Sequence, residues 1–162
     1  MCNKDKNDLP VDPANNDDSL PMRRSLYCDF VGGAVQHRLR FGGGRGQGLP
    51  KAAGLKPGIN PHIIDATAGL GRDAFLLASL GATVTMIERS TEMHALLHDG
   101  MAQALDAGGV TAEIISRMKL IHGDAIQLLP SLSPEIVLVD PMHPPRNKSA
   151  LVKAEMRQIR AI

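Results

Sequence analysis

From residue 61 onward, short apolar runs rich in β-branched residues alternate with longer segments that have helical spacing. The strand-like runs span residues 62–67, 82–89, 117–123 and 135–140, and the helix-like segments span residues 72–81, 91–107, 124–130 and 148–160. Ser90 or Thr91 is the expected N-cap of the second of these helices. Because such units connect by right-handed crossovers, their order predicts an α/β chain with a mostly parallel sheet and helices on both faces.

The region before residue 61 has a different character. Residues 1–20 are polar and show no apolar period, which predicts a disordered tail. The segment 25–41 is interpreted as two short extended runs separated by Gly32 and Gly33, and a glycine-rich stretch follows. We therefore expect three regions, which are a tail at 1–20, a basic glycine-rich hairpin or cap at 21–58 and the α/β domain at 59–162.

Charge is segregated along the chain, although the net charge is only +1. Residues 21–60 contain seven Lys or Arg and one acidic residue, whereas residues 61–145 contain four basic and ten acidic residues. Residues 1–20 are acidic, with two Lys and five Asp, and residues 146–162 are again basic. This pattern suits a polyanion at the rim of the molecule and a neutral or cationic ligand at its centre, but an ordinary solvated surface explains it equally well.

The sequence shows no pattern typical of a disulfide, a metal site or a membrane span. Cys2 and Cys28 lie far apart, and no Cys or His set has metal-ligand spacing. No stretch approaches the roughly 18 apolar residues that span a bilayer, and the N-terminus has no apolar signal region. We expect a cytoplasmic protein that uses neither a metal nor a membrane.

The first strand-like run leads into a glycine turn. Asp65 stands four residues before Gly69, Gly71 follows, and Glu88 lies 23 residues after Asp65. Ligands of parallel sheets bind beyond the carboxyl ends of the strands, where Glu88 is placed to accept hydrogen bonds from ribose hydroxyls. An acid before the glycines, supported by Asp73, favours the cationic end of S-adenosylmethionine over a pyrophosphate.

Other interpretations of this turn stay open. Gly69, Gly71 and Ala74 also satisfy the dinucleotide fingerprint, so a nicotinamide-dependent oxidoreductase is an alternative. The glycines could also serve only to pack a helix on a strand. Asp124, after the third strand-like run, suits either the amino group of adenine or the N-cap of the following helix.

The fourth strand-like run ends in Asp140-Pro141-Met142-His143-Pro144-Pro145. An exocyclic base nitrogen is a poor nucleophile because its lone pair is delocalised into the ring. The Asp140 carboxylate and the Pro141 carbonyl can accept its two N–H bonds and aim the lone pair at a methyl group. His143 is the candidate for stacking on the target base. The motif indicates transfer of a methyl group to an amino nitrogen, and a structural proline turn is the simpler alternative.

Several of these segments together resemble the RsmJ family of small-subunit (16S) ribosomal RNA guanine-N2 methyltransferases. The resemblance runs from about residue 27 to residue 160 and rests on FGGGRG, DATAGLGRDAF and LVDPMHPPRNKSALVKAEMR. It implies a Rossmann-like class I methyltransferase fold that uses S-adenosylmethionine to methylate the N2 amino group of a guanine in 16S rRNA. The family continues beyond this segment, so we expect a partial methyltransferase domain whose C-terminal strands are missing.

The resemblance also implies site residues. By matching positions, cofactor contacts fall on Arg72, Asp73, Glu88, Arg89, Asp124, Ala125 and Asp140. Arg38, Arg40, Arg45, Lys148 and Lys153 are candidates for contacts with RNA phosphates. An adenine-N6 methyltransferase and an inactive cofactor-binding remnant remain alternatives.

Overall fold

The computed structural model describes residues 26–42 and 44–140, in which strands and helices alternate as the sequence predicts. The strands are β1 (His62–Asp65), β2 (Thr83–Glu88), β3 (Met118–His122) and β4 (Ile136–Leu138). The helices are α1 (Gly33–Phe41), the 3-10 turn η1 (Gly44–Gly46), α2 (Gly48–Ala52), α3 (Arg72–Ser79), α4 (Thr91–Ala107), α5 (Gly109–Ile115) and α6 (Ala125–Leu132).

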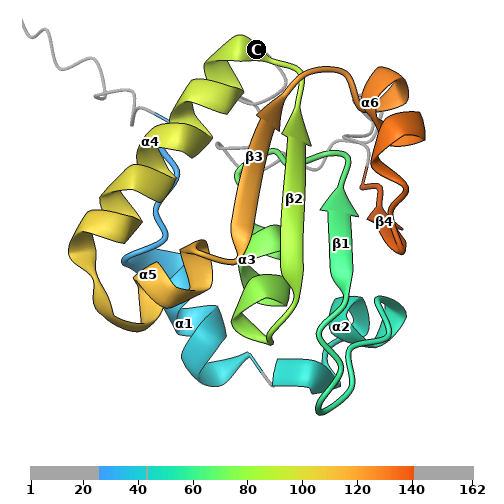
Figure 1. The fold of residues 1–162 in the computed structure, drawn as a ribbon. Helices are drawn as coiled ribbons and strands as arrows, with labels where there is room; N and C mark the ends of the chain where they lie inside the picture. The colour runs from blue at the N-terminus through green and yellow to red at the C-terminus, as the bar shows by residue number, and fades with distance from the viewer. Residues whose placement is uncertain (1–25, 43, 141–162) are drawn as a thin grey trace, which may run out of the picture.

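The four strands form a parallel sheet in the order β3-β2-β1-β4 (Figure 1). The chain moves outward from β1 through β2 to β3 and then crosses back, so β4 pairs with the free side of β1. The direction of winding therefore reverses between β1 and β4. Ligands of open parallel sheets bind at such a switch point, beyond the carboxyl ends of the strands. The predicted α/β class and parallel sheet are confirmed.

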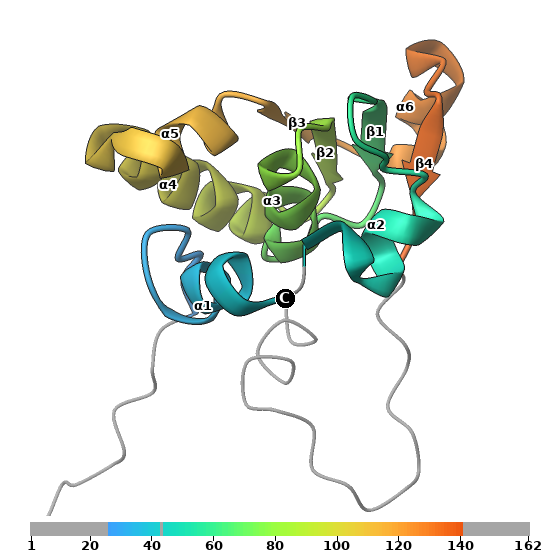
Figure 2. The ribbon, with the colours of Figure 1, turned by 90° about the horizontal axis from the view of Figure 1, so that it is seen from below.

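Helices cover both faces of the sheet, as expected. Figure 2 shows α1, α2 and α3 on one side, with α6 beside β4 on the other. Alternate residues of the strands point toward α3 and α4 and build the main hydrophobic cluster, which includes Ile63, Ala74, Leu77, Val84, Met86, Leu97 and Met118. Among the described residues, no helix combines the length and the apolar character needed to cross a membrane.

The prediction of two extended runs at 25–41 is wrong, because residues 33–41 form α1. Val35 and Leu39 stand one helical turn apart and face Phe75 of α3, so packing against α3 favours a helix. Short apolar runs have no decisive period of their own, which is why the sequence was ambiguous here. The missed signal was Asp29, whose Oδ1 accepts hydrogen bonds from the two backbone amides that precede α1.

The helix α4 was predicted from the sequence, whereas the following helix α5 was not. Ser90 is the N-cap of α4, since its hydroxyl accepts a hydrogen bond from the Met93 amide at 3.2 Å. The short helix α5 was not predicted, and it follows Gly108 directly. The predicted tail at 1–20 and helix at 148–160 lie outside the described residues, and the domain boundaries stay predictions.

Candidate active site at the ends of three strands

The turn between β1 and α3 connects the ends of β1 and β4. The Thr67 amide donates to Asp65 Oδ1 at 3.0 Å, and the Thr67 hydroxyl lies 3.5 Å from the same oxygen. That hydroxyl also accepts a hydrogen bond from the Asp140 amide at 2.8 Å. Thr67 therefore links two of the predicted site residues, although it was not itself predicted. A threonine two positions after an aspartate in a turn was the available signal.

Glu88 ties the same turn to the end of β2. Its Oε2 accepts a hydrogen bond from the Gly69 amide at 3.2 Å, and its Oε1 accepts one from the Ser90 amide at 2.9 Å. Each carboxylate oxygen can accept a second hydrogen bond. Glu88 thus orients the glycine turn and keeps acceptor capacity for a ligand hydroxyl. The structure brings Asp65, Glu88 and Asp140 together around one turn, and their roles in binding stay predictions.

Gly71 is fixed by conformation and by packing. It precedes α3 with φ of +67°, a conformation that favours glycine. A Cβ atom at this position would lie 2.8 Å from Leu97 Cδ2 and 3.1 Å from Phe30 Cζ. The glycine therefore allows the turn to approach the buried core closely.

Asp65 is the buried acid of the site. The residue is 3% exposed, and burial raises the pKa of its carboxyl to about 6. The hydrogen bond from the Thr67 amide opposes this shift, whereas the nearby charges of Asp73 and Asp140 add to it. A cation beside Asp65 would favour the ionised carboxylate and lower this pKa.

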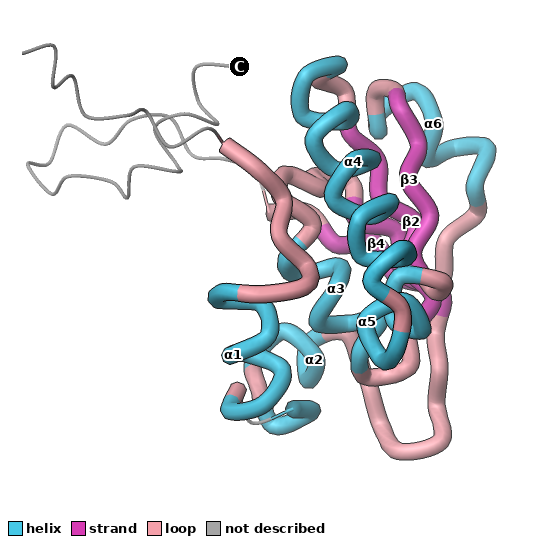
Figure 3. Tube along the Cα trace, turned by 90° about the vertical axis from the view of Figure 1, so that its left-hand side faces the viewer, coloured by secondary structure: helices cyan, strands magenta, loops and turns pink. Residues whose placement is uncertain are grey.

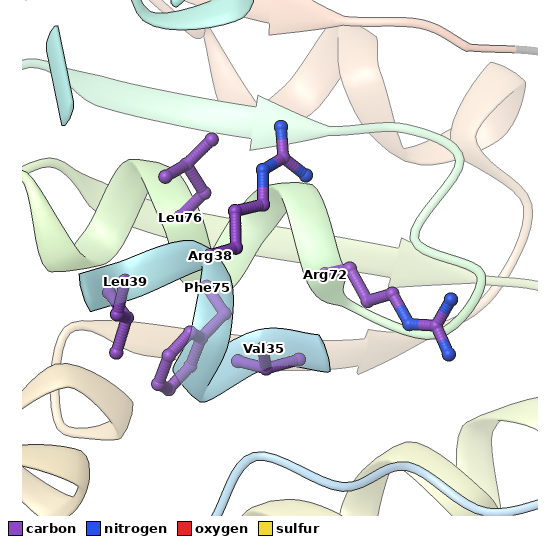
Figure 4. Close-up of a pocket in the computed structure, with 6 residues that line it drawn as sticks. All are labelled: Val35, Arg38, Leu39, Arg72, Phe75 and Leu76. Carbon is purple, nitrogen blue, oxygen red and sulfur yellow. The ribbon is translucent and has the colours of Figure 1, made fainter. Parts of the chain in front are cut away.

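Arg72 and Asp73 begin α3. Asp73 Oδ1 accepts a hydrogen bond from Arg38 Nη1 of α1 at 2.9 Å, and both side chains are 38% exposed. A hollow of about 190 Å³ between α1 and α3 is lined by Arg38, by Arg72 and by apolar side chains including Val35 and Phe75. Figure 4 shows the two guanidinium groups pointing to different ends of this hollow, so they do not converge on one anion.

The residues beyond β2 and β3 form the other rim of the site. The Arg89 carbonyl lies 3.3 Å from His122 Nε2, and the ring of His122 lies 4.9 Å from that of His94. Asp124 caps α6, because its Oδ1 accepts a hydrogen bond from the Ile126 amide at 2.9 Å. The N-cap interpretation of Asp124 is confirmed, while contacts of Asp124 and Ala125 with adenine stay predictions.

The candidate RNA contacts have different surroundings. Arg38 donates to Asp73 and to Gln47, and Arg45 Nη2 donates to the Leu80 carbonyl at 2.6 Å. Arg40 is exposed. Pro141, His143, Lys148 and Lys153 lie outside the described residues. In the part of the chain that the structure describes, no group of three or more His, Cys, Asp or Glu residues is arranged to hold a metal ion.

With this geometry established, comparison with known proteins identifies the family. The family model described as "Putative SAM-dependent methyltransferase" matches residues 12–162. The chain belongs to this methyltransferase family. A relative from Agrobacterium fabrum, named Ribosomal RNA small subunit methyltransferase J, is 66% identical over 141 residues, which cover 87% of this chain and 68% of the relative. A relative of the same name from Brucella anthropi is 67% identical, with 85% of this chain and 67% of that protein covered.

A solved structure supports the same assignment. The crystal structure of a SAM-dependent methyltransferase from Neisseria gonorrhoeae matches with a TM-score of 0.63 and 38% identity, covering 72% of this chain and 48% of that chain. The chain thus spans about half the length of this structural relative and about two thirds of the curated relatives. The predicted family and fold are confirmed, and the nicotinamide-dependent alternative is not supported by these relatives.

Proposed function

We propose that this chain carries the cofactor site and the amino-acceptor motif of a methyltransferase that modifies the N2 amino group of a guanine in 16S rRNA. One observation carries the proposal. Three acidic residues from separate strand ends, Asp65, Glu88 and Asp140, meet at the β1–α3 turn through hydrogen bonds to its backbone and to Thr67. The turn stands at the switch point of the sheet, where ligands bind.

The residues at this turn fit S-adenosylmethionine. The ammonium group of its amino-acid part would lie near the buried carboxylate of Asp65 and near Asp73. The ribose hydroxyls would donate to Glu88, whose oxygens retain acceptor capacity. Gly69, Gly71 and the backbone at Arg72 would allow close approach, and Arg89, Asp124 and Ala125 would line the adenine side. When bound, the cofactor supplies an electrophilic methyl group on a sulfonium sulfur.

Asp140 would hold the amino group that receives the methyl group. Its backbone amide donates to the Thr67 hydroxyl, so the residue lies directly beside the β1–α3 turn. The Asp140 carboxylate and the Pro141 carbonyl would accept the two N–H bonds of the guanine amino group. This contact stabilises the positive charge that develops on nitrogen. His143 would stack on the base, which must leave its own stack to enter the site.

The substrate would be ribosomal RNA, and the protein would therefore work in the cytoplasm. The support comes from the names of the curated relatives and from the basic residues around α1. The segment from residue 30 to residue 64 contains five Lys or Arg and no Asp or Glu. Such a surface attracts the phosphates of RNA without reading its bases. Lys148 and Lys153 would extend it.

The test uses the full chain with radiolabelled S-adenosylmethionine and 16S rRNA from a strain that lacks the gene. Nuclease digestion followed by mass spectrometry should yield N2-methylguanosine, and rRNA from the parent strain should accept no methyl group. Methylation of adenine N6 would instead support the alternative. Asp140→Ala should lower the rate about 100- to 1000-fold, as loss of a transition-state contact does. Glu135→Ala, an exposed acid just before β4, is the matched control and should leave the rate unchanged.

A further inference from the structure

The ion pair between α1 and α3 joins two residues that were assigned to different ligands. Arg38 Nη1 donates to Asp73 Oδ1 at 2.9 Å, while Arg38 Nε donates to Gln47 Oε1 at 3.2 Å. Figure 3 shows α1 lying next to α3, although the two helices are far apart in the sequence. Arg38 was a candidate for RNA phosphates, and Asp73 a candidate for the cofactor. In the structure each is the other's partner.

This pair can be exchanged at low cost. Both side chains are 38% exposed, and water and salt compete with an ion pair that solvent reaches to this extent, so its contribution is small. A ligand ammonium group that approaches Asp73 can replace Arg38, and a phosphate that approaches Arg38 can replace Asp73. The same exposure rules out a large structural role for the pair.

Arg40 and Arg45, the other arginines of residues 30–64, make no such ion pair with a predicted cofactor residue among the described residues. Arg45 donates to a backbone carbonyl, that of Leu80, which is not expected to bind the cofactor. Arg40 makes no hydrogen bond or ion pair with the described residues. Arg38 instead binds the carboxylate of Asp73, a predicted cofactor residue in the first turn of α3. Within this segment, Arg38 is therefore the arginine that connects the basic surface with a predicted cofactor residue, as far as the described residues show.

We propose that Arg38 couples cofactor binding to RNA binding by exchanging partners. Without cofactor, Asp73 holds Arg38; when the ammonium group of the cofactor binds Asp73, Arg38 is released to an RNA phosphate. The idea rests on the proposed function, since it needs both ligands. By linkage, RNA then tightens cofactor binding by the same factor as cofactor tightens RNA binding.

The experiment measures binding of unmodified, transcribed 16S rRNA to the full chain by filter binding, with and without S-adenosylhomocysteine. Calorimetry first establishes that S-adenosylhomocysteine binds the wild-type chain. We expect it to tighten RNA binding about three- to five-fold, the scale of one exposed ion pair. A five-fold change corresponds to about 1 kcal/mol.

Variants of the two partners should change RNA affinity in opposite directions. Arg38→Gln should weaken RNA binding and remove the response to S-adenosylhomocysteine, whereas Arg38→Lys should keep part of the response. Asp73→Asn should tighten RNA binding without cofactor, because Arg38 is already released. Arg40→Gln is the matched control, since it removes one charge from the same helix and should weaken RNA binding while leaving the response intact.

A double variant shows whether Asp73→Asn acts by releasing Arg38 or only by removing a negative charge that repels RNA. If Asp73→Asn acts through Arg38, its gain in RNA affinity should vanish in the Arg38→Gln background. An equal gain in both backgrounds would overturn the proposal, as would a wild-type chain whose RNA affinity ignores bound S-adenosylhomocysteine. If the wild-type chain binds no S-adenosylhomocysteine at all, the proposed function itself fails.

Discussion

Two glycine-rich segments of this chain use glycine for different purposes. In the β1–α3 turn, Gly71 has a positive φ, and a Cβ there would press on Leu97 and Phe30. In the segment that contains η1 and the start of α2, a Cβ added at Gly46 or Gly48 would meet no atom within 4 Å, and neither glycine has a positive φ. The first segment is held by the core, and the second is held by side chains such as Arg45, which bonds to the end of α3. Similar composition therefore does not indicate similar constraint.

Replacing Gly71, the glycine that the core constrains, should change the stability of the fold most. Gly71→Ala should destabilise the fold by about 2–4 kcal/mol, because it adds left-handed strain and overpacks the core. Urea unfolding followed by circular dichroism measures the change. A loss below about 0.5 kcal/mol would show that the turn yields easily and would break the distinction between the two segments.

Asp65→Asn tests how much free energy of unfolding the buried acid of the same turn costs. The folded pKa of about 6 lies above the usual value for Asp, so the carboxyl lowers stability as pH rises through about 6. The neutral variant should be more stable than wild type by about 1–3 kcal/mol at pH 8, with the difference nearly gone at pH 4. Unfolding at both pH values checks this, and a difference independent of pH would contradict it.

In the same variant, calorimetry should show weaker binding of S-adenosylhomocysteine. A more stable protein that binds its ligand less well would show that Asp65 is retained for the ligand rather than for the fold. Unchanged affinity would remove Asp65 from the cofactor site.

A smaller effect tests how the second segment is attached. Arg45→Gln removes the hydrogen bond to the Leu80 carbonyl and should cost about 0.5–1 kcal/mol. Arg40→Gln removes the same charge from a residue without such a bond to the described residues and is the control. Equal stability of the two variants, measured by urea unfolding, would mean that the Arg45 contact does not hold the segment.

The smallest effect is expected at the open glycines. Gly46→Ala should change stability by no more than about 0.5–1 kcal/mol and should favour the folded state, since alanine restricts the unfolded chain. Thermal unfolding measures the shift. A destabilisation similar to that of Gly71→Ala would show that both segments are equally constrained.

Much of the fold and part of the site could be predicted from local sequence. The four strands, α3, α4 with its Ser90 cap, and α6 follow from period and capping residues. Asp65, Gly69, Gly71 and Glu88 were predicted to lie together because a parallel sheet places the residues after its strands at one edge. The helix α1 was missed because its apolar residues Val35 and Leu39 are stabilised by packing against Phe75 of α3, which local sequence does not reveal.

The alternation of strands and helices and the acids at the strand ends follow from the sequence alone, because both depend on neighbours along the chain. The pairing of β4 with β1 and the contact of Thr67 with Asp140 depend on the folded chain. The ion pair between Arg38 of α1 and Asp73 of α3 depends on it as well. These contacts join segments many residues apart, and their partners are chosen by packing of the shared core rather than by any local pattern.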